Sequence, residues 1–138
     1  MNQHVLLDSN VIVDYALKRS GFVENAEMIF KQIEEETIVG CISSSAVTDV
    51  YYIVANKTND DYAWEMMEYI YQTLRILPVI QETIRAALDS GMHDFEDAVQ
   101  AAAARDIGIG IVVTRDRAGF HNAGLRIYSP EEFLEIKK

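Results

Sequence analysis

Short apolar runs alternate with amphipathic segments along the chain, and this alternation limits the fold more than any other feature. Apolar runs typical of buried strands lie at residues 3–8, 38–42, 75–80, 109–114 and 126–129. Each is followed by a stretch with apolar residues near helical spacing. Strands that alternate with helices predict an α/β fold, in which helices cover both faces of a parallel sheet of about five strands.

The segments between these strands carry helix signals. Asp94 precedes an alanine-rich stretch in the position of an N-cap, and Pro130 suits the first turn of a terminal helix. A long helix is expected to begin at residues 59–61. The apolar residues expected to face inward from it are Trp64, Met67, Ile70, Tyr71 and Leu74.

The composition fits one compact chain of 138 residues with an apolar core. Hydrophobic residues make up 49% of the chain, so we do not expect disorder. The lone Cys41 excludes a disulfide scaffold. No apolar run approaches the roughly 20 residues of a membrane-spanning helix, and no signal peptide is recognisable. We therefore expect a single domain over residues 1–138 that acts in the cytoplasm and has no membrane partner.

The net charge of −10 restricts how such a protein can bind nucleic acid. With 22 acidic and 12 basic residues, the surface cannot hold RNA or DNA mainly through Lys and Arg contacts to phosphates. The charge does not exclude a nuclease, because an active site built from carboxylates obtains its positive charge from divalent metal ions. The positions of the acidic residues therefore decide the question.

Four Asp residues come near the carboxyl ends of predicted strands. In an open parallel sheet, ligands bind at these ends, near the point where the strand order reverses. Asp8 ends the first strand and Asp116 follows the fourth, while Asp49 and Asp97 lie early in two helices. Each of the four has a structural alternative, although turn chemistry accounts only partly for an acid at the end of a buried strand. Asp97 can complete a helix cap with Asp94, and Asp49 can be a solvated helix residue.

The motifs around these residues resemble those of the PIN-domain family, which includes the VapC-like ribonuclease toxins of bacterial toxin–antitoxin pairs. The four matching stretches begin with Asp8-Ser9-Asn10-Val11-Ile12 and continue with residues 44–52, 94–100 and 113–117. The ending at residues 128–134 is also similar to many family members. The stretches occur in the family's order and at family-like spacing over nearly the whole chain.

The resemblance implies a three-layer α/β/α sandwich and an endoribonuclease that uses Mg²⁺ or Mn²⁺. The metal-binding and catalytic residues that it implies are Asp8, Asp49, Asp97 and Asp116. The toxin ribonucleases usually carry Glu at the second motif, where this chain has the shorter Asp49, and the first motif has Ser9 in place of the commoner Thr. In the third motif Asp97 is preferred to Asp94, because the Asp-Ala-hydrophobic sequence matches there. The resemblance also implies a small antitoxin partner and a homodimer.

Carboxylate ligands favour Mg²⁺ or Mn²⁺, which are hard cations that prefer oxygen. Asn10 and Thr114 are expected to hydrogen-bond the carboxylates and hold them in place. Zinc is not favoured, because the residues that it prefers show no ligand spacing. These residues are His4, His93, His121 and Cys41.

Contacts to the RNA substrate must be local in so acidic a chain. Basic residues outnumber acidic ones between residues 105 and 126, where Arg115 and Arg117 flank Asp116 and are candidate phosphate contacts. Lys18 and Arg19 are a second candidate pair. Three Tyr residues are able to stack on bases, although core packing is the simpler role for them. They are Tyr51, Tyr52 and Tyr62.

Other nucleotide and phosphate enzymes fit the sequence less well. A phosphatase of the haloacid dehalogenase type needs a second acid where this chain has Asn10, and a receiver domain needs paired acids after the first strand. The Gly108-Ile109-Gly110 sequence is only a fragment of a dinucleotide-binding fingerprint. The remaining alternative is a catalytically weak or inactive PIN-fold module that binds RNA or a protein partner without cutting.

Overall fold

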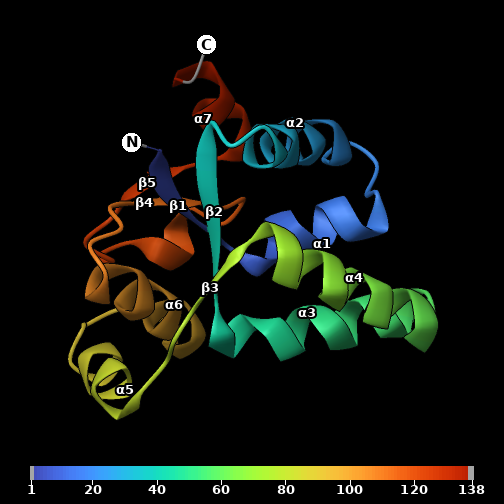
Figure 1. Cartoon of the computed structure of the whole chain (residues 1–138). Helices are drawn as coiled ribbons and strands as arrows, with labels where there is room; N and C mark the ends of the chain where they lie inside the picture. The colour runs from blue at the N-terminus through green and yellow to red at the C-terminus, as the bar shows by residue number, and fades with distance from the viewer. Residues whose placement is uncertain (1, 137–138) are drawn as a thin grey trace.

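A parallel sheet forms the centre of the computed structural model, which describes residues 2–136 (Figure 1). Its strands lie in the order β3-β2-β1-β4-β5, and every neighbouring pair is parallel. The five strands are β1 (Gln3–Leu7), β2 (Ile38–Ser43), β3 (Arg75–Leu77), β4 (Ile111–Val113) and β5 (Arg126–Tyr128). The predicted α/β fold with a sheet of about five parallel strands is confirmed.

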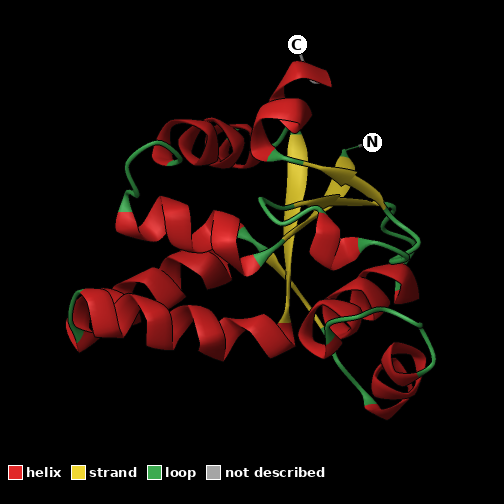
Figure 2. Ribbon diagram, turned by 180° about the vertical axis from the view of Figure 1, so that it is seen from behind, coloured by secondary structure: helices red, strands yellow, loops and turns green. Residues whose placement is uncertain are grey.

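Helices pack on both sides of this sheet, as Figures 1 and 2 show from opposite directions. Helices α1 to α4 and α7 contribute to the core on one face, and α6 covers the other face with α5 packed against it. The helices are α1 (Ser9–Leu17), α2 (Val23–Glu34), α3 (Ser44–Lys57), α4 (Asp60–Thr73), α5 (Gln81–Leu88), α6 (Phe95–Asp106) and α7 (Pro130–Ile136), with the short 3-10 helix η1 at Ala118–Phe120.

Strand β1 is buried on both of its faces. Val5 and Leu7 join the core that α1 to α4 and α7 complete, whereas Leu6 joins the core beneath α6 together with Cys41. Alternate side chains of a strand point to opposite faces, so a central strand of a covered sheet must be apolar at every position. This explains why an uninterrupted apolar run precedes Asp8.

Four predicted strands are shorter in the structure. The first ends at Leu7, and Asp8 is the N-cap of the helix that follows. The third ends at Leu77, directly before Pro78, which has no backbone N–H for the ladder. The fourth begins at Ile111 rather than Ile109, and the last ends at Tyr128. The strands thus keep their places in the chain, and only their ends differ.

The predicted inward face of α4 is wrong at two positions. Trp64 and Tyr71 are 71% and 74% exposed, whereas Ala63 and Met66 are buried together with Ile70. Two sets of apolar residues on α4 have helical spacing, and both include Ile70. The set with the smaller side chains, which contains Ala63 and Met66, faces the core and packs against α3. The Trp64 ring instead meets a neighbouring tyrosine of α3 edge-on at the surface.

The strand order reverses between β1 and β4. The chain adds β2 and β3 on one side of β1 and then adds β4 and β5 on the other side. Helices that follow adjacent strands therefore diverge here, and the carboxyl ends of β1 and β4 border a crevice in folds of this kind. Within residues 2–136, no helix is long and apolar enough to cross a membrane.

Candidate functional site

Asp8 lies at the carboxyl end of β1 and begins helix α1 as its N-cap. Its side chain is only 6% exposed, and Oδ1 accepts a 2.7 Å hydrogen bond from the backbone N–H of Ser9. The backbone N–H of Asp8 donates to the carbonyl of Val113 at 3.0 Å, which extends the pairing of β1 with β4. A buried carboxylate therefore stands at the point where the strand order reverses.

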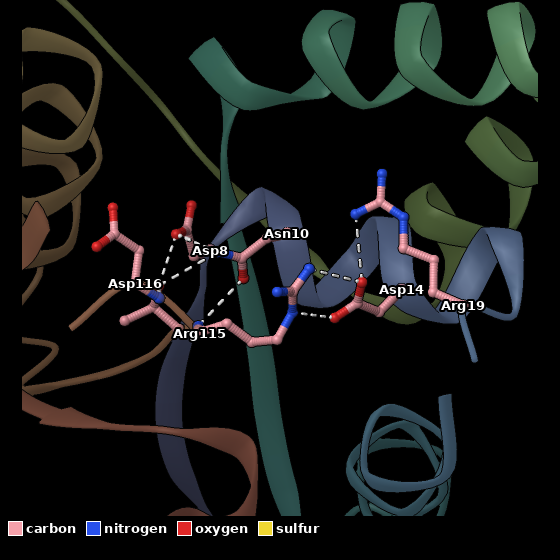
Figure 3. A network of polar contacts seen from close by, with 7 residues as sticks. Asp8, Asn10, Asp14, Arg19, Arg115 and Asp116 are labelled. Atoms are coloured by element: carbon pink, nitrogen blue, oxygen red, sulfur yellow. Dashed lines mark hydrogen bonds and ion pairs between the residues drawn. The ribbon is translucent and has the colours of Figure 1, made fainter. Parts of the chain in front are cut away.

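Asn10 and Thr114 hold Asp8 from two sides, as predicted. Thr114, which directly follows β4, donates to Oδ2 of Asp8 at 2.7 Å, and the side-chain amide of Asn10 donates to the same oxygen at 3.2 Å. The Thr114 hydroxyl also accepts the backbone N–H of Asp116 at 2.9 Å. In Figure 3 the carboxylates of Asp8 and Asp116 point to the same side of this network.

Asp97 and Asp116 meet at Gly119. Asp97 extends from the first turn of α6, and Asp116 follows β4 and accepts the backbone N–H of Gly119 at 3.1 Å. A methyl group at Gly119 would overlap Oδ2 of Asp97 and lie 2.6 Å from Oδ2 of Asp116. The absence of a side chain at this position thus leaves open a small space that two carboxylate oxygens border.

Electrostatic coupling links these acids. Burial and the neighbouring carboxylates of Asp8, Asp94, Asp116 and Glu96 raise the pKa of Asp97 to about 7. Burial also raises the pKa of Asp8, and its hydrogen bonds from Thr114 and Ser9 oppose that rise. The metal-free site therefore holds protons more readily than isolated carboxylates do, and a divalent cation would compete with them.

Asp49 is next to Glu96, which in turn neighbours Asp97 and so links Asp49 to the cluster of Asp8, Asp97 and Asp116. Asp49 lies in α3 and Glu96 in the first turn of α6, and these helices pack against each other. Burial and the adjacent Asp49 carboxylate raise the pKa of Glu96. The Glu96 carboxyl group therefore holds a proton more readily than an isolated one does.

Asp94 has the helix-capping role that the sequence allowed for it. It is the N-cap of α6, and its side chain accepts the backbone N–H of Asp97 at 2.9 Å. Asp97, one turn further along, faces Asp8 and Asp116 closely enough for both to raise its pKa. The geometry therefore favours Asp97 over Asp94 as the acid that faces the space at Gly119.

The donor set suits a hard divalent cation, although the side chains are not arranged around one. In residues 2–136, no group of three or more His, Cys, Asp or Glu side chains already has the spacing to hold a metal ion. The oxygens of Asp8, Asp97 and Asp116 nevertheless converge and repel one another, and Gly119 leaves room between two of them. Oxygen-only donors of this kind fit Mg²⁺ or Mn²⁺.

Arg115 is bound inside the protein rather than directed freely to solvent. Its Nε donates to Asp14 at 2.6 Å and its Nη2 at 3.1 Å, and Asp14 is 1% exposed (Figure 3). The guanidinium also lies 3.9 Å from the ring centroid of Phe22. These contacts fix the segment after β4 against α1, so Arg115 positions the neighbouring Asp116.

The other basic candidates differ in the exposure of their side chains and in the ion pairs that these side chains form. The side chain of Arg117 is 57% exposed and pairs with Glu132 at 2.6 Å, an exposed ion pair that water and salt weaken. Arg19 pairs with Asp14 at 3.3 Å, whereas Lys18 is exposed at the end of α1. Arg117 and Lys18 are therefore the cations of these four that are most free to meet a phosphate.

The three candidate tyrosines also differ in how exposed their side chains are. Tyr52 is 64% exposed, whereas Tyr51 and Tyr62 are half-buried. The hydroxyl of Tyr62 donates to the carbonyl of Ala16 at 2.6 Å, which ties α4 to α1. Core packing therefore accounts for Tyr62, and Tyr52 is the most exposed of the three rings.

Sequence reasoning missed Glu96, Gly119 and Gln100. Glu96 stands directly before Asp97 and was hidden in what reads as a solvated helix start. Gly119 does not have a positive φ, so its backbone conformation does not require glycine. Only the space that its missing side chain leaves points to a role, and a sequence does not show that space. Gln100 is the one polar side chain within the buried stretch of α6, and that position was the only available sign of it.

Comparisons of structure give the same fold in proteins of low sequence identity. The crystal structure of FitAcB from Neisseria gonorrhoeae has a TM-score of 0.64 and 24% identity, over 92% of this chain and 98% of that one. A DNA-bound VapBC structure from Salmonella typhimurium has a TM-score of 0.67 and 20% identity, over 94% and 99%. Mycobacterium tuberculosis VapC20, described as a sarcin-ricin loop cleaving toxin, has a TM-score of 0.63 and 13% identity, over 78% and 86%.

The sequence itself matches a family model. No curated protein matches the chain at a significant level. The model described as PIN domain, however, matches residues 4–118, a span that contains Asp8, Asp49, Asp97 and Asp116. With the parallel sheet and the converging acids at its switch point, this match shows that the chain belongs to the PIN domain family.

Proposed function

We propose that the protein is a metal-dependent endoribonuclease that hydrolyses RNA phosphodiester bonds. The observation that carries the proposal is the proximity of the Asp8, Asp97 and Asp116 carboxylates, of which Asp97 and Asp116 border the space at Gly119. Carboxylates that repel one another, of which Asp8 is buried and Asp97 half-buried, are an unfavourable arrangement for the fold alone, and a divalent cation relieves the repulsion. A single domain over residues 1–138 is part of this proposal.

Asp8, Asp97 and Asp116 would hold Mg²⁺ or Mn²⁺, with Asp49 completing the set. Once bound, such a cation supplies Lewis acidity, which makes water a stronger acid and neutralises charge on the phosphate. The hydrogen bonds from Thr114 and Asn10 keep the Asp8 carboxylate in one orientation. Glu96 lies next to Asp49, and burial and the Asp49 carboxylate raise its pKa, so Glu96 is a candidate to exchange a proton with water in the site.

The substrate side of the proposal rests on few residues. Arg117 would contact a phosphate next to the scissile bond, whereas Arg115 would act by holding Asp116 in place. The charge of −10 leaves little affinity for RNA on the bare surface, so we expect binding to depend on the metal. RNA is preferred to DNA as the substrate on the family resemblance.

The test is a cleavage assay with structured and single-stranded RNA, combined with calorimetric titration of Mn²⁺. Asp8→Asn should abolish both cleavage and tight metal binding while leaving the fold intact. The matched control is Asp61→Asn, an exposed acid in the first turn of α4 outside the cluster. Full metal-dependent cleavage by Asp8→Asn would refute the assignment.

The biological role that we propose is the toxin of a type II toxin–antitoxin pair in the cytoplasm, acting as a homodimer until a small antitoxin binds it. Support comes from the family resemblance and from fold relatives described as a toxin and as VapBC. Expression of the chain alone should arrest growth. If a gene for a small antitoxin lies immediately upstream, its expression together with this chain should restore growth. Light scattering measures the proposed dimer.

The second candidate function is a PIN-fold module that binds RNA or a protein without cutting. The short acid Asp49 and the lack of a preformed metal cluster in the described chain favour it. Metal binding without cleavage across varied RNA substrates would support this module over the nuclease.

A further inference from the structure

One polar side chain lies within the buried part of helix α6. Residues 98–104 of this helix are all buried, and all except Gln100 are Ala or Val. The side chain of Gln100 is fully buried, and neither its Oε1 nor its Nε2 has a hydrogen-bond partner in the described part of the chain. A buried amide without partners destabilises the folded state, so its presence calls for a physical reason.

Gln100 stands beside the converging acids. It follows Asp97 by one helical turn and lies on the same side of α6. Its amide approaches the Asp8 carboxylate closely enough to help lower the pKa of that group, although it stays outside the geometry of a full hydrogen bond. The unpaired amide is therefore directed at the same carboxylate that Thr114 and Asn10 hold from the other elements.

We propose that Gln100 is a positioning residue for the divalent cation of this site. With a cation held at Asp8, the Gln100 amide would hydrogen-bond the Asp8 carboxylate and water in the site, and would so keep that carboxylate in one orientation. The inference rests on the proposed function, because it needs a cation at Asp8. Groups that hydrogen-bond metal ligands in this way typically change metal affinity by about 10- to 100-fold when they are removed.

A merely structural Gln100 and a positioning Gln100 predict opposite results. Gln100→Leu removes both unpaired atoms at nearly the same volume, so the metal-free protein should unfold at the same temperature as the wild type or at a higher one. The same variant should bind Mn²⁺ about tenfold or more weakly. Gln100→Met, with a longer and more flexible side chain, serves as the second variant if Leu does not pack.

Gln32 provides the matched control. Its Oε1 is also buried and unpartnered, but it lies in α2, which does not contribute to the acid cluster. Gln32→Leu should leave the Mn²⁺ affinity unchanged. The measurements are calorimetric titration of the wild-type chain and of each variant with Mn²⁺, and thermal unfolding in the presence of a chelator.

The outcomes separate the two proposals. A wild-type protein that binds no Mn²⁺ would overturn the proposed function and this inference together. Wild-type binding with equal affinity in Gln100→Leu and Gln100→Met would overturn only the inference. A lower unfolding temperature without any change in Mn²⁺ affinity would assign Gln100 a structural role instead.

Discussion

The hydroxyl of Thr114 donates a 2.7 Å hydrogen bond to Oδ2 of Asp8 and so joins the ends of β4 and β1. The same hydroxyl oxygen accepts the backbone N–H of Asp116 at 2.9 Å. One fully buried side chain thus sets the positions of two acids that are 108 positions apart in the sequence but adjacent in the fold.

Replacing this hydroxyl should affect both stability and metal binding. Thr114→Val keeps the shape but removes one hydrogen bond to the buried Asp8 carboxylate and the acceptor of the Asp116 N–H, which we expect to cost about 1–3 kcal/mol in the free energy of unfolding. The Mn²⁺ affinity should fall by about tenfold or more. Thr114→Ser retains the hydroxyl and should lose much less of either. Denaturant unfolding and calorimetry measure the two effects, and wild-type affinity in Thr114→Val would contradict the prediction.

Gly119→Ala tests the space between two acids directly. The added methyl group would overlap Oδ2 of Asp97 and press on Asp116, so the carboxylates must move apart. Because small displacements of catalytic groups can cost about 100-fold in rate, we expect a loss of that order in RNA cleavage. The backbone of Gly119 does not have a positive φ, and the fold should therefore tolerate Ala.

Gly110→Ala is the control for this change. Gly110 also lacks a positive φ, and a methyl group there would meet nothing within 4 Å. We expect wild-type cleavage and an unfolding temperature close to that of the wild type from this variant. If Gly119→Ala cleaves RNA as well as Gly110→Ala does, the space at Gly119 is not part of the site.

Arg115 and Arg117 should respond in opposite ways to truncation. Arg115→Ala leaves the buried Asp14 with the longer ion pair to Arg19, and we expect the unfolding free energy to fall by about 2–3 kcal/mol. Arg117→Ala removes only an exposed ion pair, so stability should stay nearly unchanged while RNA binding weakens. Thermal unfolding and RNA affinity at fixed salt separate the two roles. Unchanged RNA affinity in Arg117→Ala would remove it from the substrate site.

Sequence position was sufficient to predict the centre of this site. An apolar run that is interrupted by Asp8 predicts a buried strand end, and parallel strands bring their carboxyl ends to one edge of the sheet. Asp116 follows β4 by the same logic, and β4 pairs with β1. The fold class followed from the alternation of strands and helices for the same reason, because each strand needs a helix to return the chain.

The remaining features depend on contacts that the sequence does not contain. Arg115 reads as a free cation until its 2.6 Å bond to Asp14 is seen across 101 residues. On α4, the pattern with Trp64 and Tyr71 is as periodic as the one that is buried, so periodicity alone cannot choose the inward face. Gly119 contributes only empty space, which no residue pattern reveals.

The raised pKa of Asp97 predicts how the stability of the metal-free protein depends on pH. Its carboxyl has a pKa near 3.8 in the unfolded chain and about 7 in the folded protein. Between these values the folded state binds the proton more tightly than the unfolded state does. The stabilisation from the protonated carboxyl is therefore complete below about pH 4 and is lost as the pH rises through about 7.

Thermal unfolding with a chelator, measured from pH 4 to pH 8, detects this loss when wild-type protein is compared with Asp97→Asn. The variant carries no titrating group at this position, so its unfolding temperature should fall less steeply over the interval below pH 7. Asp61→Asn, in the first turn of α4, should follow the wild-type curve. Added Mn²⁺ should raise the wild-type curve most at the upper end, where the carboxylate is free to bind it. Parallel curves for Asp97→Asn and the wild type would mean that Asp97 titrates in its ordinary range and does not face the other acids.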